Sequence, residues 1–416
     1  MSIVEVGERS AGRPVGPGVR SAREYKGSDP SPPDAASNST VEVGLGYNFA
    51  VTKAPETSIP SPHEIATELS KRVIGQRDAI REMSIAMSKK LAGLPVGNLL
   101  MIGSSGTGKT TLMRSVEDYL EQRPHLALRS TVVRMHANVL GEEAQKGRPG
   151  EAILHRLLER AREKLGPEAS VDALIEQARN GVVFVDEVDK IRAWVGDQPN
   201  TSGIRAQEAL LTVMENEAVP LALPQWAGGH QVTIDSSGLL FVCGGAFEGL
   251  YDTVYDRVTI GRDRGALQPV TVVEEGRVEE RIIFHLQDWL RNEDLFDYGM
   301  SPQFLSRYDA VVLLADLTVE ELEQIFLGVP DSGYHMARAY FKSRGTNLVL
   351  SKKAVRRVAQ EAAKEKRLGA RALKEVFRRV IRDYEYAPET KVNGPENSIL
   401  LDLKEVDDAL QKRARG

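Results

Sequence analysis

The sequence of 416 residues contains one cysteine, Cys243. A single thiol cannot form a disulfide within the chain, and it cannot build a cysteine-rich zinc site. No apolar run approaches the ~20 residues that a membrane-spanning helix needs. The first residues also lack the basic and then apolar segments of a secretory signal. These absences predict a soluble intracellular protein of the reducing cytoplasm.

An excess of positive charge is also missing. The 54 Lys and Arg residues are outnumbered by 59 Asp and Glu residues, so the net charge is -5 and no overall basic field attracts nucleic acid. Residues 352–382 are locally basic, but no interleaving of aromatic residues and no binding motif accompanies the charges, which favours a solvated face or a subunit interface. We therefore expect neither nucleic acid nor a membrane among the partners.

Changes in composition and in hydrophobic pattern divide the chain. Residues 1–60 are rich in Gly, Pro and Ser, so they cannot bury enough apolar surface to offset the entropy of ordering, and we predict a disordered tail. Its segment 41–51 is compatible with a strand or a docking segment. Over residues 61–316, continuous apolar runs alternate with helical patterns, which predicts an α/β domain with a largely parallel sheet buried on both faces. The expected strands lie at 98–103, 130–137, 181–188 and 238–245.

Residues 317–416 predict a small, mainly helical domain. Thr318 and Glu321 have the spacing of a capping box at a helix start. A long helical pattern follows and is broken at Gly369. An apolar run at 398–403 predicts a closing strand. With the length of the chain, these features indicate a tail and two folded domains.

The run GSSGTGKT at residues 103–110 matches the pattern G-x-x-x-x-G-K-[ST] between a predicted strand and a predicted helix. In such a P-loop, glycines let backbone N–H groups approach phosphates, the lysine reaches the β and γ phosphates, and the last hydroxyl binds magnesium. A chance glycine-rich turn is the alternative, and the strand and helix around it argue against that. We predict ATP and Mg²⁺ as cofactors, bound by Ser105, Gly106, Thr107, Gly108, Lys109, Thr110 and Thr111.

The run VVFVDEVDK at residues 182–190 ends a predicted buried strand in two adjacent acids. Asp186 at the strand tip is suited to hold magnesium through water, and Glu187 is suited to polarise the attacking water. Acids at a strand end often only meet solvent, but a P-loop upstream favours the catalytic interpretation. Together the two motifs predict an ATPase.

The order and spacing of the motifs resemble the AAA+ family and, within it, the ClpX protein unfoldases, over roughly residues 62–390. The P-loop and the acidic strand are followed by GLLFVCGGAFEGL, SPQFLSRYD and LGARALKEV. The resemblance implies a ring of identical subunits, a hexamer, that acts on protein substrates. The segment RVIGQRDAI resembles the ClpX segment beside the adenine, which places Val73, Ile74 and Gln76 near the base.

The resemblance also implies two arginines at the phosphates. Arg307 in SPQFLSRYD matches the arginine finger, which reaches the site of the neighbouring subunit and contributes about 10³–10⁵ in rate. Arg371 in LGARALKEV matches the sensor-2 arginine. Taken alone, either residue is usually a solvated charge. Around the finger, Ser306, Tyr308 and Asp309 differ from the glycine and the Leu-Pro of ClpX.

The segment QKGRPGEAIL at residues 145–154 departs from the family. ClpX has Gly-Tyr-Val-Gly there, a pore loop whose aromatic side chain grips the polypeptide, whereas this chain has Arg148 and Pro149 between the two glycines. Pro149 also suits the first turn of a helix that begins at Glu151. A guanidinium can contact carbonyls or acidic and aromatic side chains, but the bulky apolar grip is lost.

Two further ClpX features do not match. The first 60 residues have no cysteine, so they do not form its four-cysteine zinc domain. In place of its Ile-Gly-Phe docking loop, Ile260-Gly261 is followed by Arg262, which would not fill an apolar pocket, so docking on a ClpP peptidase is not predicted. The predicted function is ATP-driven protein unfolding or remodelling. The alternatives are a ring-forming ATP switch that binds a dedicated partner without threading and, less in keeping with the acidic charge, a nucleic-acid-remodelling ATPase.

Overall fold

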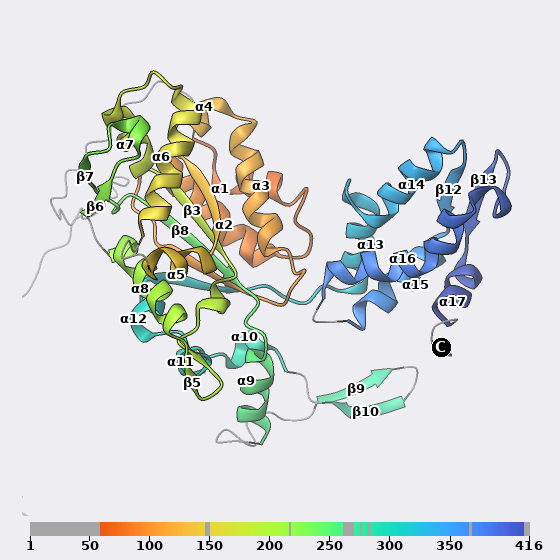
Figure 1. Cartoon of the computed structure of the whole chain (residues 1–416). Coiled ribbons are helices and arrows are strands. Elements are labelled where there is room, and N and C mark those ends of the chain that lie inside the picture. The colour runs from red at the N-terminus through yellow and green to blue at the C-terminus, as the bar shows by residue number, and fades with distance from the viewer. Residues whose placement is uncertain are drawn as a thin grey trace, which may run out of the picture. The chain divides into compact units, whose positions relative to one another are not determined.

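The computed structural model describes residues 59–145, 150–215, 218–260, 270–274, 277–281, 284–365 and 368–411 (Figure 1). The chain divides into two units, Met1–Thr52 and Lys53–Gly416, and only the second contains described residues. The predicted disordered tail, apart from Ile59 and Pro60, and the segment 41–51 lie outside the described residues. So do Arg148 and Pro149 of the predicted pore loop.

The centre of the second unit is a five-stranded, all-parallel sheet in the order β11-β1-β8-β3-β2. Four strands confirm the predicted apolar runs. The fifth, β11, was not predicted; it lies at an edge of the sheet, and residues such as Asp309 and Val311 are exposed. The strand bounds are β1 (Asn98–Ile102), β2 (Val132–His136), β3 (Val182–Asp186), β8 (Leu240–Gly245) and β11 (Tyr308–Leu313).

Helices cover both faces of the sheet because its strands are apolar on both sides. Along β3, Val182 and Phe184 belong to one hydrophobic cluster and Val183 and Val185 to the other. Cys243 on β8 is fully buried, as predicted for a small core residue. The first cluster includes residues of α1 (Pro62–Leu69), α2 (Arg77–Leu91), α3 (Lys109–Glu121) and α4 (Pro124–Ala127); the second includes residues of α5 (Asn138–Gln145), α6 (Glu151–Leu165), α7 (Val171–Arg179), α8 (Thr201–Glu215) and α9 (Leu250–Thr259).

Short elements connect the strands at the rim of this region. Two antiparallel hairpins and three short helices lie on the path from β3 to β11, together with two single-turn 3₁₀ helices. Their bounds are η1 (Val188–Ile191), β4 (Trp194–Val195), β5 (Gln198–Pro199), β6 (Val219–Ala222), η2 (Gln225–Ala227), β7 (Gln231–Ile234), α10 (Leu286–Trp289), α11 (Asn292–Tyr298) and α12 (Pro302–Leu305). A further hairpin joins β9 (Val270–Glu274) and β10 (Arg277–Arg281).

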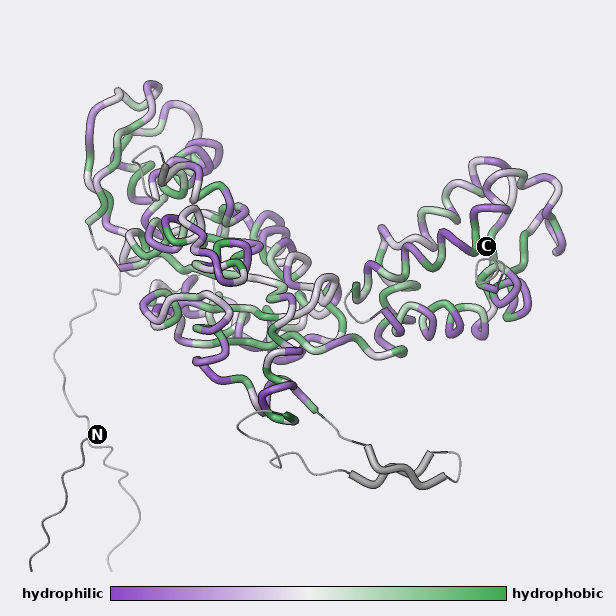
Figure 2. The backbone as a smooth tube through the Cα atoms, turned by 60° about the horizontal axis from the view of Figure 1, so that its bottom comes forward, coloured by the Kyte–Doolittle hydropathy of each residue, from purple (hydrophilic) through white to green (hydrophobic). Residues whose placement is uncertain are grey.

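The C-terminal residues have a hydrophobic cluster of their own, which runs from Leu322 to Val406. The predicted capping box is present, since the Glu321 N–H donates to Thr318 Oγ1 (3.2 Å) and the Thr318 N–H to Glu321 Oε2 (2.8 Å). Hydrophilic and hydrophobic residues alternate along the helices (Figure 2). The elements are α13 (Val319–Gly328), α14 (Gly333–Ser343), β12 (Asn347–Leu350), α15 (Lys352–Ala363), α16 (Ala370–Tyr386), η3 (Pro388–Thr390), β13 (Ser398–Leu401) and α17 (Leu403–Gln411).

The helical pair broken at Gly369 is therefore confirmed. The strand expected at 398–403 is present as β13, but it does not close the domain, because α17 follows it. The domain boundary at residues 316 and 317 stays a prediction. Within the described part of the chain, no helix is both long and apolar enough to cross a membrane.

Candidate nucleotide-binding site

The P-loop joins the end of β1 to the start of α3. Gly106 and Gly108 have φ angles of 76° and 107°, which L side chains rarely adopt, so glycine is required to turn the chain there. No side chain caps the N-terminus of α3, whose first residue is Lys109. The first N–H groups of such a helix have no partner within it, and they favour an anion such as a phosphate.

The Lys109 side chain is only 7% exposed. Its ammonium group donates hydrogen bonds to the carbonyl oxygens of Gly103 and Ser104. Burial lowers the pKa of Lys109 to about 8, and the charges of Asp186 and Asp189 act in the opposite direction. The ammonium is thus desolvated inside the loop, where an anionic phosphate would be a stronger partner than two carbonyls.

Thr110 and Asp186 meet at the tip of β3. The Thr110 hydroxyl donates to Asp186 Oδ2 over 2.6 Å, and Asp186 Oδ1 accepts from the Glu187 N–H over 2.9 Å. A hydroxyl and a carboxylate side by side are hard oxygen donors of the kind that Mg²⁺ prefers alongside phosphates and water. The residues present therefore fit a magnesium ion held between Thr110 and Asp186.

Glu187 has a φ angle of 60°, one of four positive values among the described non-glycine residues. This left-handed backbone is strained for glutamate, and such strain is found where the surroundings impose a functional conformation. The side chain is half exposed, and its Oε2 lies 3.8 Å from His136 Nδ1 at the end of β2. The carboxylate therefore lies at the wall of the cleft and is accessible to solvent.

These residues line one cleft with a volume of about 1070 Å³. Its lining includes the predicted nucleotide-binding residues apart from Gln76, and also Asp186, Glu187 and Arg371; the predicted residues are Val73, Ile74, Ser105, Gly106, Thr107, Gly108, Lys109, Thr110 and Thr111. The cleft is also lined by apolar side chains, those of Leu317, Ile325 and Val329. Gln76 does not line the cleft, because it is buried with its amide hydrogen-bonded to the backbone of Ala315 (2.8 and 3.0 Å).

The turn before α16 packs directly on the P-loop. Arg371 Nη1 donates to Ser105 Oγ over 2.7 Å, and the Ala370 N–H donates to the Gly106 oxygen over 3.1 Å. A Cβ atom on Gly106 would lie 2.1 Å from the Leu368 oxygen. The structure therefore brings Arg371 to the phosphate-binding loop from a segment more than 260 residues away.

Arg307 does not line this cleft. It follows α12, its side chain is 43% exposed, and its guanidinium pairs with the carboxylate of Glu215 at the end of α8. Its carbonyl oxygen accepts a hydrogen bond from Asn98 Nδ2 (2.9 Å) on β1. A finger that serves a neighbouring subunit has to lie outside its own site, so this placement is compatible with the predicted role.

Asp189 is a site residue that the sequence reasoning missed. It is buried on η1, its Oδ1 accepts from the Ala246 N–H (3.0 Å) at the end of β8, and it lines the cleft. Lys190 Nζ lies 3.6 Å from its Oδ2. The signal was the third acid in VVFVDEVDK, but only the packing of β3 against β8 shows that it ties the two strand ends together.

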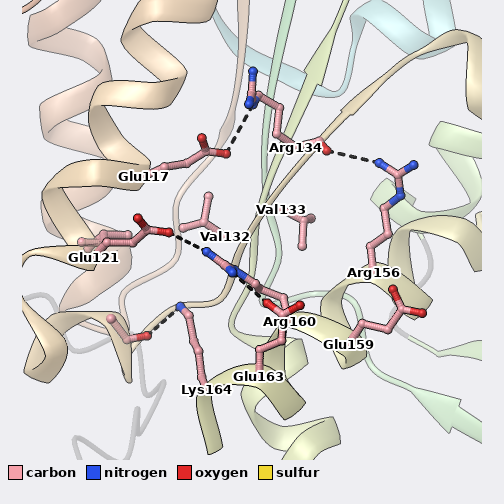
Figure 3. Close-up of a pocket in the computed structure, with 12 residues that line it drawn as sticks. Glu117, Glu121, Val132, Val133, Arg134, Arg156, Glu159, Arg160, Glu163 and Lys164 are labelled. Carbon is pink, nitrogen blue, oxygen red and sulfur yellow. Dashed lines mark hydrogen bonds and ion pairs between the residues drawn. The ribbon is translucent and has the colours of Figure 1, made fainter.

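A second cavity of about 350 Å³ lies beside β2, between α3 and α6 (Figure 3). Two of its arginines already have partners there: Arg160 pairs with Glu121 (2.6 Å) and Glu163 (2.7 Å), and Arg156 donates to the Arg134 backbone oxygen (3.2 Å). None of the predicted site residues lines it. The nucleotide chemistry therefore belongs to the larger cleft.

The fold and this cleft define a P-loop ATPase of the AAA+ class. The family model described as AAA domain (Cdc48 subfamily) matches residues 94–311. The ATP-dependent Clp protease ATP-binding subunit ClpX 3 of Methylococcus capsulatus is 31% identical over 352 residues, which are 78% of this chain and 76% of that protein. The ClpX subunit of Treponema denticola is 28% identical over 345 residues (78% and 77%), and that of Bacteroides thetaiotaomicron is 29% identical over 374 residues (84% and 83%). The chain belongs to the AAA+ ATPases and, among them, to the ClpX family.

Proposed function

We propose that the chain hydrolyses MgATP in this cleft and uses the energy to unfold or remodel proteins, as a subunit of a homo-oligomeric ring. The observation that carries the proposal is the convergence of Lys109, the Thr110–Asp186 pair and Arg371 on one P-loop. In keeping with the resemblance to ClpX, we propose a hexamer.

Each group at the cleft has a distinct role. Lys109 and the N-terminus of α3 bind the phosphates, and Val73 and Ile74 contact the base. Thr110 and Asp186 hold the magnesium ion, which neutralises charge on the phosphates when it is bound. Glu187 orients and polarises the attacking water. These assignments rest on the positions of the side chains around the loop.

Two arginines complete the site in the proposal. Arg371 donates to the γ phosphate from its place against Ser105. Arg307 lies outside its own cleft and stabilises charge in the cleft of the next subunit. Hydrolysis therefore requires two subunits, which is why the proposed active form is a ring.

The β4–β5 hairpin offers a surface for the protein substrate. Trp194 and Val195 are each 50% exposed, and an exposed Trp beside an exposed Val suits contact with an unfolded, partly apolar polypeptide. Only the four residues of η1 and two further residues separate Glu187 from the start of the hairpin. Its base is anchored by the Ala193 N–H, which donates to the Gly299 oxygen over 2.7 Å. The first strand of the hairpin thus exposes two apolar side chains and lies close in sequence to the proposed catalytic acid.

Loss of fluorescence from a tagged, folded fluorescent protein in the presence of ATP tests the proposed work. We expect ATP-dependent unfolding by the full chain, no unfolding by Glu187→Gln, and slower unfolding by Trp194→Ala with ATPase activity retained. Trp226→Ala is the matched control, because that Trp is 38% exposed but stacks under Arg162 (4.5 Å), away from the hairpin.

A second candidate is an ATP switch that binds a dedicated partner without threading. The sequence observation that favours it is Arg148-Pro149 in place of an aromatic grip. Intact ATPase activity without unfolding of any of several tagged substrates would decide for the switch. Co-purification with the Glu187→Gln variant in ATP would then capture the partner.

A further inference from the structure

Gln207 is a buried amide in the middle of α8, with 2% of its surface exposed. Its Nε2 donates to the Ile191 oxygen (2.8 Å) and to the Gly299 oxygen (3.0 Å), and its Oε1 accepts from the Ser301 N–H (2.9 Å). One side chain therefore satisfies three backbone groups in two segments that are about a hundred residues apart.

The two segments lead to the two kinds of catalytic residue. Ile191 is the last residue of η1, which begins directly after Glu187. Ser301 is the N-cap of α12, and its hydroxyl accepts from the Phe304 N–H (3.3 Å). α12 ends at Leu305, two residues before Arg307. The Gln207 amide thus connects η1, which follows Glu187, with the segment 299–307, which contains Arg307.

α8 also contacts the far end of the arginine segment. Glu215, the last residue of α8, pairs with the Arg307 guanidinium. The Arg307 carbonyl is held by Asn98, on the strand that leads into the P-loop. The short path from Ser301 to Arg307 is therefore held at its start by Gln207 and at its end by Glu215 and Asn98.

Only an amide can make the three Gln207 bonds, because they need two donors and one acceptor on one planar group. A leucine of similar size would leave two carbonyls and one N–H without this partner in the interior. A buried group of this kind over-determines the position of the backbone around it.

We propose that Gln207 is a positioning residue, which holds Arg307 in the place from which it serves the neighbouring subunit and couples that place to η1 behind Glu187 of its own subunit. The inference rests on the proposed function, in which Arg307 acts across the interface. It adds a connection inside one subunit between its own hydrolytic site and the finger that it offers to the next.

The test uses Gln207→Leu in the full chain. Rings of this variant should bind ATP with unchanged affinity, since their P-loop is intact, but should lose about 10- to 100-fold in kcat, less than a whole finger contributes. Mixing them with Lys109→Ala subunits, which have an intact Arg307, should restore part of the activity. Arg307→Ala subunits are mixed with Lys109→Ala subunits in parallel. Gln177→Leu is the matched control for the substitution itself, because Gln177 donates one hydrogen bond, to Thr131 Oγ1 (3.0 Å).

Rescue of Gln207→Leu to the extent seen for Arg307→Ala supports the proposal, because a general loss of folding would not be rescued by a partner. Wild-type kcat, a loss of ATP affinity as large as the loss of kcat, or no rescue while Arg307→Ala is rescued would each overturn it. If Arg307→Ala is not rescued in rings shown to be mixed, the finger of the proposed function fails and this inference fails with it. If Gln207→Leu does not fold, Gln207→Asn replaces it, because its shorter amide cannot span the same three groups, and the same outcomes apply.

Discussion

The buried Lys109 ammonium makes ATP binding dependent on pH. Burial lowers the pKa of this group to about 8 in the free protein. A bound triphosphate brings negative oxygens next to the ammonium and should return its pKa toward the ordinary value of about 10.4. Binding above pH 8 therefore has to take up a proton, and the affinity for ATP should fall as the pH rises through this region.

The magnitude follows from the two pKa values. At about pH 8.5, roughly a quarter of the free protein has a protonated Lys109, so binding should take up about 0.75 proton per ATP. Below about pH 7 the uptake should be close to zero. Well above pH 8 the dissociation constant should rise toward about tenfold per pH unit, which is about 1.4 kcal/mol of binding free energy.

Isothermal titration calorimetry in two buffers of different ionisation enthalpy measures this uptake directly. The matched control is Lys90→Met, because burial also lowers the pKa of Lys90 to about 8, but Lys90 lies on α2 outside the cleft and donates to the Gly238 oxygen. Wild type and Lys90→Met should show the same uptake on binding ATP. An uptake below about 0.2 proton near pH 8.5 would refute the reasoning, as would an uptake that disappears in Lys90→Met.

Arg371→Ala should lower kcat about 10- to 100-fold, because a hydrogen bond to a charged group contributes about 1.5–3 kcal/mol; an effect on KM alone in steady-state kinetics would contradict the role. Gly106→Ala should abolish ATP binding in a fluorescent-nucleotide assay, because the added Cβ would lie 2.1 Å from the Leu368 oxygen. The control Gly93→Ala should bind ATP normally, because Gly93 has a similar φ of 70° but open space around it. Lys90 has a lowered pKa in the folded protein, so between about pH 8 and 10 the folded state binds fewer protons at this residue than the unfolded state. The unfolding free energy of wild type should therefore rise with pH relative to that of Lys90→Met, by up to about 1.4 kcal/mol per pH unit. A difference in unfolding free energy between the two proteins that stays constant across this pH range, measured by denaturant unfolding, would contradict that.

Local motifs and strand patterns were read correctly from the sequence because they depend on neighbouring residues. The φ angles that only glycine adopts readily are required at Gly106 and Gly108, and the loop that contains them is contiguous. The inner strands β3 and β8 are continuous buried runs, since both faces of the sheet are covered. The capping box at Thr318 depends on side chain–backbone hydrogen bonds between residues three apart, and the helix break at Gly369 has a φ of 49°, which glycine adopts readily. The ATPase class was therefore determined by the sequence.

The arrangement around these motifs depends on contacts between distant segments, which no local pattern specifies. β11 was missed, and the structure shows it at an edge of the sheet with some of its side chains exposed. The bond from Asp189 to Ala246 and the hydrogen bonds of Gln76 to Ala315 depend on how strand ends and loops meet. The sequence determined that this protein has a P-loop, a candidate catalytic acid and candidate arginines. Only the tertiary structure decided that Arg371 reaches the P-loop while Arg307 points away from it, because the packing of helices on the sheet sets where those side chains lie.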